Sequence, residues 1–248
     1  MRLKGKTAIV TGAGSGIGAG IARRFVAEGA RVLIADLNLE AARGIAAELG
    51  AQAYAARVDV ADAASVTALA LEATRLLGDV DVLVNNAGVG HPPQPLDELD
   101  EAAFERILAI NVRSIYLTAR AFVPAMKRRR RGAILNIAST AAVSPRPGLT
   151  WYNASKGFVV TATRSMAVEL APFGIRVNAL NPVASETPLL KTFMGSDTPE
   201  IRARFLATIP LGRFATPEDM GHAATYLCAD EASMVTGVAL EVDGGRCI

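Results

Sequence analysis

Tyr152 and Lys156 stand four residues apart in a segment with a helical pattern, so their side chains should share one face of a helix. Ser139 lies upstream, just past a predicted strand. A free tyrosine has a pKa of about 10, and a shift of about three units would let it act as a base near neutral pH. A neighbouring ammonium group favours the phenolate in this way. The spacing alone also fits a solvated helix face, so the pair gains its meaning from the rest of the chain.

A glycine-rich turn follows the first predicted strand and opens a helix. Its glycines fit the pattern G-x-x-x-G-x-G at Gly12, Gly16 and Gly18, whereas a strict G-x-G-x-x-G cannot be fitted. Glycine lets the backbone approach a ligand closely, and the free N–H groups of a helix start point at an anion. The turn therefore predicts a binding site for a phosphate group.

Polar residues stand at the ends of the next predicted strands. Asp36 ends the second strand, 18 residues after Gly18, where a carboxylate can accept hydrogen bonds from the 2′-hydroxyl of an adenosine ribose. A 2′-phosphate would meet a like charge there, so Asp36 favours NAD over NADP. Asp59 is placed for a contact with the adenine edge. Asn85 and Asn86 could either bond neighbouring strands or line a ligand crevice, and both roles stay open.

Composition excludes several classes of protein. The 248 residues are 51% hydrophobic and 20% charged with a net charge of +2, which indicates a globular chain and no large field for nucleic acid or anionic lipid. No run of about 18 apolar residues occurs, so we expect no membrane span. The two cysteines predict reduced thiols and a cytoplasmic protein. His91 and His222 lack metal-ligand companions, so we expect no catalytic metal.

Short β-branched runs alternate with helical patterns, which predicts an α/β fold with a parallel sheet covered by helices on both faces. We expect one domain, because no linker or repeat interrupts residues 1–248. Residues 182–212 read as irregular or locally helical. The predicted strands are 7–11, 31–35, 51–58, 80–85, 133–138, 175–180 and 238–242. The predicted helices end at residue 28, cover 39–49, 63–77, 101–127 and 151–173, and begin again at residue 217.

Jointly, these motifs resemble the short-chain dehydrogenase/reductase family in its form of about 250 residues. The resemblance covers essentially the whole chain. It rests on Thr11-Gly12-x-x-x-Gly16-Ile17-Gly18, Asn85-Asn86-Ala87-Gly88, Asn111, Ser139, Tyr152-x-x-x-Lys156 and Val242-Asp243-Gly244-Gly245. It implies a Rossmann fold with a seven-stranded parallel sheet and, usually, a homotetramer.

The resemblance also implies roles for individual residues. Tyr152 would be the general acid/base, and Ser139 would hold and polarise the substrate oxygen. Lys156 would bond the nicotinamide ribose and lower the pKa of Tyr152, while Asn111 would support a water in a proton relay to Lys156. The implied NAD site comprises Gly12, Ser15, Gly16, Ile17, Gly18, Asp36, Leu37, Asp59, Val60, Asn86, Ala87, Gly88, Tyr152, Lys156, Pro182, Val183 and Thr187. The family commonly has Pro-Gly where this chain has Pro182-Val183, so a valine side chain must be accommodated.

The predicted substrate pocket is mostly apolar, with residues 183–212 as a lid. Its walls would be Thr140, Ala141, Val143, Trp151, Leu189, Leu190, Phe193 and Met194. This set suits an apolar, cyclic or aromatic alcohol better than a free sugar. Trp151 could instead pack at a subunit interface.

The predicted function is hydride transfer between a secondary, cyclic or aryl alcohol and NAD, which gives a ketone or an aldehyde. One alternative is a 3-oxoacyl-[acyl-carrier-protein] reductase, in which the run Lys127–Arg131 would dock an acidic carrier. We favour the interpretation that these cations are solvated and complement the dipole of a helix at its C-terminus. Asp36 also counts against such a reductase, because enzymes of this kind usually use NADPH. A second alternative is a non-catalytic NAD-binding protein on the same fold.

Overall fold

The computed structural model describes residues 1–248 and contains one seven-stranded sheet in which every strand pair is parallel. The strands, in spatial order, are β3 (Ala53–Arg57), β2 (Arg31–Asp36), β1 (Thr7–Thr11), β4 (Val82–Asn85), β5 (Gly132–Ile137), β6 (Ile175–Pro182) and β7 (Ala239–Val242). The predicted single-domain Rossmann fold is confirmed. The strand order reverses between β1 and β4, and a crevice forms at such a reversal, beyond the carboxyl ends of the strands.

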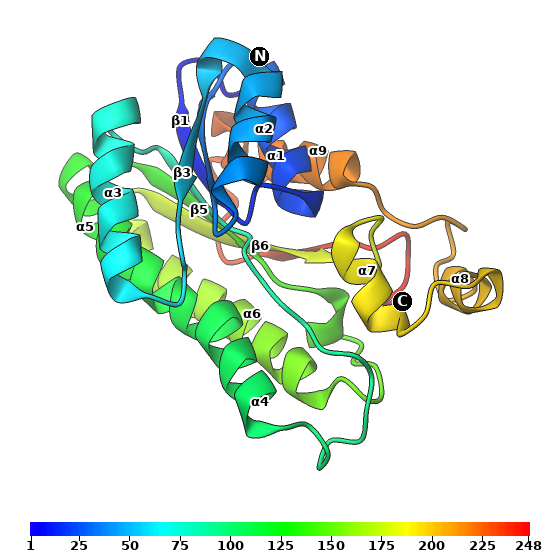
Figure 1. The fold of residues 1–248 in the computed structure, drawn as a ribbon. Helices are drawn as coiled ribbons and strands as arrows, with labels where there is room; N and C mark the ends of the chain where they lie inside the picture. Colours follow the sequence, from blue (N-terminus) through cyan, green and yellow to red (C-terminus); the bar gives the residue numbers. More distant parts are fainter.

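Helices cover both faces of the sheet (Figure 1). The helices α1 (Gly16–Ala27), α2 (Leu39–Leu49) and α9 (Pro217–Cys228) cover one face, and α3 (Ala63–Leu77), α5 (Ser114–Arg129) and α6 (Thr150–Leu170) cover the other. Successive strand residues point to opposite faces of the sheet. Val10 packs in the core on the side of α1, α2 and α9, and Ile9 packs in the core on the side of α3, α5 and α6. This alternation explains why the strands are apolar throughout. None of the helices combines the length and the apolar character that a membrane crossing requires.

Several predicted elements have different bounds in the structure. The predicted helix over 101–127 is a composite of α4 (Glu101–Ile107), a π-helical segment (Leu108–Arg113) and α5. Residues 182–212 contain two short helices, α7 (Pro188–Met194) and α8 (Pro199–Leu206), each with a proline at its first position. Proline suits that position because its missing N–H would have no partner there. Both helices lie beyond the carboxyl ends of the strands (Figure 1).

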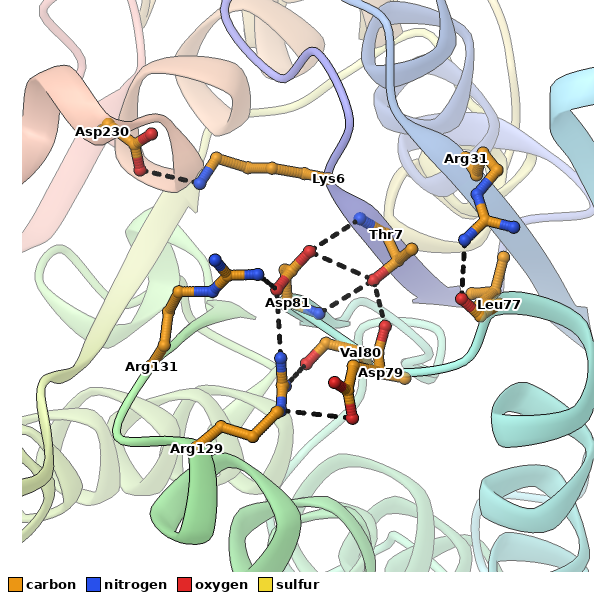
Figure 2. A network of polar contacts seen from close by, with 10 residues as sticks. All are labelled: Lys6, Thr7, Arg31, Leu77, Asp79, Val80, Asp81, Arg129, Arg131 and Asp230. Carbon is orange, nitrogen blue, oxygen red and sulfur yellow. Dashed lines mark hydrogen bonds and ion pairs between the residues drawn. The ribbon is translucent and has the colours of Figure 1, made fainter.

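At the opposite end of the sheet, where the strands begin, Asp81 connects several elements (Figure 2). Asp81 directly precedes β4. Its carboxylate accepts a hydrogen bond of 3.1 Å from the Thr7 amide. It also forms ion pairs of 3.2 Å with Arg129 and 2.6 Å with Arg131. Burial acts to raise the pKa of Asp81, but Arg131, the Thr7 amide and Arg129 together hold that pKa below its usual value. The acid thus joins β1, β4 and the connection from α5 to β5.

The prediction that Lys127–Arg131 is a solvated run is wrong for one member, Arg129, while the side chain of Arg131 stays 67% exposed. The side chain of Arg129 is only 19% exposed, and Arg131 pairs with the buried Asp81. The physical reason is that α5 ends beside the amino edge of β4, where an unpaired buried carboxylate would be costly.

Both cysteines are free, as predicted. Burial raises the pKa of Cys228 to about 12, so its thiol packs as an apolar side chain in the core.

Candidate active site

A cavity of about 530 Å³ lies at the carboxyl ends of the strands. The glycine turn, the ends of β2 and β6, the start of α6 and the helix α7 all contribute to its lining. The structure brings together Ser139 and every residue of the predicted NAD site except Gly18 around this cavity. Asn111 also lies outside its lining.

Gly18 has a packing role in the turn. A Cβ atom at Gly18 would lie 2.5 Å from both the Asn86 side-chain nitrogen and the Gly12 carbonyl oxygen. That nitrogen donates hydrogen bonds of 2.8 Å to the Thr11 carbonyl and 3.0 Å to the Gly12 carbonyl. Gly18 therefore leaves room for the amide that ties the turn to the end of β4, and its assignment to the cofactor site stays a prediction.

The two roles left open for the asparagine pair are divided between its members. Asn85 is buried and donates a 2.9 Å hydrogen bond to Asn136 on the neighbouring strand. Asn86 lines the cavity and holds the glycine turn. Neighbouring residues of an extended chain point to opposite sides, so the side chains of Asn85, at the end of β4, and Asn86, just after it, have different surroundings.

Two carboxylates lie on the cavity near the glycine turn. Asp36 accepts hydrogen bonds of 2.8 Å from the Gly14 amide and 2.9 Å from the Asn38 amide. Asp59 accepts one of 2.9 Å from the Ala61 amide. Asp36 and Asp59 are the acidic residues in the cavity lining, and both stand at this end of it.

Ser139, Tyr152 and Lys156 all line the cavity. Tyr152 and Lys156 come from one face of α6 and are 6% and 5% exposed. Burial raises the pKa of Tyr152 to about 12, and the Ser139 hydroxyl acts in the opposite direction. Burial also lowers the pKa of Lys156 to about 8. Burial therefore dominates the pKa of Tyr152, because low polarity disfavours any charge. The expected lowering of this pKa by Lys156 stays a prediction.

Asn111 lies in the π-helical segment and connects the β4 loop to α6. Its side-chain nitrogen donates to the Val89 carbonyl at 2.9 Å and to the Ser155 hydroxyl at 3.0 Å, and its oxygen accepts from the Val89 amide at 2.9 Å. A Cβ atom at Gly88 would lie 3.4 Å from both the Asn111 oxygen and the Lys156 nitrogen. Asn111 therefore stands beside the lysine, and its relay role stays a prediction.

The predicted apolar walls are partly confirmed. Thr140, Ala141, Leu189, Leu190 and Phe193 line the cavity. Val143, Trp151 and Met194 do not. Val143 is 52% exposed, and Met194 is buried in the core on the α1 side of the sheet. Trp151 turns away because its ring nitrogen donates to the Leu96 carbonyl at 2.9 Å while its ring packs edge-on against Phe104.

The valine that departs from the family pattern is accommodated by packing in the core. Val183 is buried, packs in the core and also forms part of the cavity wall. Thr187 directly precedes α7, and a Cβ atom at Gly16 would lie 3.3 Å from its side chain. The segment after β6 therefore lies directly over the glycine turn.

Other residues of the cavity lining are not indicated by any sequence pattern. Leu149, Arg146 and Phe205 line the cavity, and the ring of Phe193 packs 4.8 Å from that of Tyr152. Arg146 stands six residues before Tyr152, but the path of a loop cannot be derived from spacing. No cluster of three or more histidine, cysteine or acidic side chains is arranged to hold a metal ion.

Known proteins resemble this chain along its whole length. Residues 12–246 match the family described as Enoyl-(Acyl carrier protein) reductase. The chain is 45% identical to 4-formylbenzenesulfonate dehydrogenase TsaC1/TsaC2 of Comamonas testosteroni, with 100% of both chains covered. It is 41% identical to the 7alpha-hydroxysteroid dehydrogenase of Escherichia coli strain K12, over 99% of this chain and 95% of that one. A crystal structure of 3-ketoacyl-(acyl-carrier-protein) reductase from Brucella melitensis complexed with NADH has a TM-score of 0.95, with 49% identity over 99% of this chain and 100% of that one.

Proposed function

Because this chain belongs to the short-chain dehydrogenase/reductase family and is an oxidoreductase of CH–OH groups, we propose that it transfers a hydride between an apolar cyclic or aryl alcohol and NAD. The product would be a ketone or an aldehyde. One observation carries the proposal: Ser139, Tyr152 and Lys156 converge on the same cavity as the glycine turn.

The residues around the cavity fit a dinucleotide. A Cβ atom at Gly12 would lie 2.8 Å from the Cα of Ala87, so the turn and the β4 loop meet closely. Gly16 and Ile17, at the start of α1, line the cavity, and a helix start favours an anion. Asp36 would bind the adenosine ribose, Asn86–Gly88 would flank the cofactor, and Lys156 would bond the nicotinamide ribose. When bound, the nicotinamide would supply the site that accepts or delivers the hydride.

Two side chains of the protein would act on the hydroxyl group of the alcohol. Tyr152 would take the hydroxyl proton of the alcohol as the hydride leaves, and Ser139 would hold the same oxygen by a hydrogen bond. With a pKa of about 12, Tyr152 is a weak base at neutral pH unless a positive charge favours its phenolate. Lys156, with a pKa of about 8, is mainly charged at pH 7 and supplies that charge.

Asp36 supports NAD rather than NADP as the cofactor. Both of its oxygens are held by backbone amides, so the carboxylate is oriented at the end of β2. A 2′-phosphate at this place would be repelled by the charge.

The substrate class is supported by the cavity and by the relatives. Ala141, Leu149 and Phe193 pack around Tyr152, so the reacting hydroxyl would lie among apolar surfaces. One relative is named for 4-formylbenzenesulfonate, an aromatic aldehyde, and another for a hydroxysteroid.

Absorbance at 340 nm, with NAD⁺ and NADP⁺ in parallel, tests the proposal over a panel of aryl, cyclic, sugar, steroid and 3-hydroxyacyl alcohols. We expect NADH to form with an aryl or cyclic alcohol. Turnover with NADP⁺ and a 3-hydroxyacyl thioester alone would contradict both the cofactor and the substrate class.

The competing function is a 3-oxoacyl-[acyl-carrier-protein] reductase, which the Brucella structure favours by its name. That structure holds NADH, so Asp36 alone does not separate the two functions. The basic run gives the reductase no support, because Arg131 directly precedes β5, at the edge of the sheet opposite the cavity. A carrier docked there could not deliver its acyl chain to Tyr152.

The non-catalytic alternative is disfavoured because all three residues of the predicted chemistry reach the cavity. A homotetramer is proposed from the family resemblance, and sedimentation velocity would test it.

A further inference from the structure

Arg146 is a partly buried cation in the cavity lining that no carboxylate neutralises. Its guanidinium carbon lies 4.0 Å from the centre of the Phe205 ring. Its backbone carbonyl accepts a 2.9 Å hydrogen bond from the side chain of Asn153, the residue after Tyr152. Arg146 is therefore held near the reacting end of the cavity, between the start of α6 and α8.

A second cation, Arg246, lies nearby. Burial, and then the charge of Arg246, lower the pKa of Arg146, so the two guanidinium groups repel each other. Arg246 donates a 2.8 Å hydrogen bond to the hydroxyl of Ser144, which also lines the cavity. Its Nε atom is buried without a partner. The two arginines thus retain unused N–H donors at one place.

Such an arrangement is costly without a counter-charge. Buried cations are normally paired, because removal from water disfavours an isolated charge. The acidic residues in the cavity lining, Asp36 and Asp59, stand at the glycine-turn end instead. The missing negative charge can come from a ligand, and a planar guanidinium suits a carboxylate or sulfonate in particular.

We propose that the substrate alcohol carries a carboxylate or sulfonate group, which Arg146 binds with support from Arg246 while the hydroxyl group lies at Tyr152. This inference rests on the proposed function and specifies its substrate. The apolar side chains around Tyr152, namely Ala141, Leu149 and Phe193, would pack against the body of the molecule. A ring with a hydroxyl group at one end and an anion at the other would place the hydroxyl at Tyr152, the ring against the apolar side chains and the anion at Arg146.

Matched pairs of alcohols test the subsite. The probes are 4-(hydroxymethyl)benzoate and 4-hydroxycyclohexanecarboxylate, each compared with its own methyl ester, which has the same ring and no charge. The measured quantity is the ratio of kcat/KM for the acid to that for the ester. An oriented hydrogen bond to a charged group predicts a loss of about ten- to hundredfold in this ratio for Arg146→Gln.

Conservative and control variants separate recognition from folding. Arg146→Lys keeps the charge and should retain part of the preference for the acid. Arg128→Gln, the same change at an exposed position of α5, should leave both kcat/KM values unchanged. If Arg146 served only to hold α8 through Phe205, Arg146→Gln would lower acid and ester alike, which would overturn the inference.

The outcomes distinguish the inference from the function on which it rests. Equal kcat/KM for acid and ester in the wild type, with NADH formed from both, would overturn the anion subsite and leave the proposed function standing. No reduction of NAD⁺ or NADP⁺ by any alcohol would contradict the proposed function. Calorimetric binding of 4-methylbenzoate, which has no hydroxyl group, then tests the subsite alone: we expect about tenfold weaker binding in Arg146→Gln. Equal binding by both proteins would overturn the subsite.

Discussion

Lys156 donates a hydrogen bond of 2.8 Å from its ammonium nitrogen to the carbonyl oxygen of Ile137, the last residue of β5. Ser139 stands two residues beyond Ile137, so this bond fixes α6 relative to the strand that carries the serine. The lysine nitrogen also lies 5.9 Å from the centre of the Tyr152 ring. The three polar side chains of the site are thus positioned by rigid elements, which is a requirement for oriented proton transfer.

Tyr152→Phe should abolish turnover while NADH binding is retained. The phenyl ring keeps the packing against Phe193 and removes the hydroxyl group that would move the proton. General acid–base catalysis contributes about 10²–10⁴-fold, and we expect at least this loss in kcat. Fluorescence titration measures NADH binding, and absorbance at 340 nm measures turnover. Equal turnover in the variant would disprove the assigned role.

The pH dependence of alcohol oxidation should respond to Lys156→Met. Oxidation needs the phenolate of Tyr152, so kcat/KM rises with pH as the tyrosine loses its proton. Removal of the ammonium charge leaves burial to act on the tyrosine, whose pKa is already raised to about 12. The rising limb of the profile should therefore move to higher pH in the variant. A profile with the same midpoint as the wild type would show that Lys156 does not act on Tyr152.

Asp36→Asn should shift the cofactor preference toward NADP⁺. The amide keeps an acceptor for the Gly14 N–H and removes the negative charge that repels a 2′-phosphate. Hydrogen bonds to charged groups predict a change of about ten- to hundredfold in the NAD⁺/NADP⁺ ratio of kcat/KM. Glu40→Gln, at an exposed carboxylate on α2, controls for net charge and should leave the ratio unchanged.

Gly18→Ala should weaken NADH binding and lower stability. The added methyl group would meet Asn86 and the Gly12 carbonyl at 2.5 Å, so the turn must open. Overpacking of this kind costs about 1–3 kcal/mol. Gly44→Ala on α2 is the matched control, because a Cβ atom there has no neighbour within 4 Å. Since alanine favours a helix by about 1 kcal/mol over glycine, the control should be as stable as the wild type or more so. Urea unfolding compares the two variants, and similar stabilities would contradict the packing role.

Asp81→Asn should destabilise the fold in a pH-dependent manner. We expect a loss of about 2–3 kcal/mol at pH 7, because the buried partner of two arginines loses its charge. The pKa of Asp81 is lowered in the folded chain, so its contribution is fully present above the unfolded pKa of about 4 and is lost as pH falls through the folded value. The difference from the wild type should therefore shrink below about pH 4.

Asp230→Asn is the control for this prediction. Asp230 pairs with Lys6 at 2.7 Å, but its side chain is 90% exposed, and surface pairs contribute about 0–1 kcal/mol. Thermal unfolding of both variants at several pH values provides the measurement. A pH-independent loss in Asp81→Asn would show that the carboxylate acts through its shape and not through its charge.

The parts of the site that follow from local rules were predictable. The glycine turn, Asp36 at the end of β2 and the shared face of Tyr152 and Lys156 depend on residues close in the sequence and on the periods of strands and helices. The parallel sheet brings the ends of its strands to one edge, so Ser139 could be placed beside them. The Rossmann fold and the oxidoreductase class follow from this combination.

Local patterns in the chain therefore specify the strands, the helices and the chemical groups at the strand ends and on the helix faces. Which loop residues reach the cavity depends instead on contacts between distant parts of the chain. Trp151 is withdrawn by a bond to Leu96, while Arg146 is brought in by its contact with Phe205. The ion pairs of Asp81 also depend on distant contacts, because they bind two arginines of a run that the sequence predicts to be solvated. The physical reason is that such contacts join residues from 48 to 59 positions apart, and their energies depend on burial and geometry that no local pattern encodes.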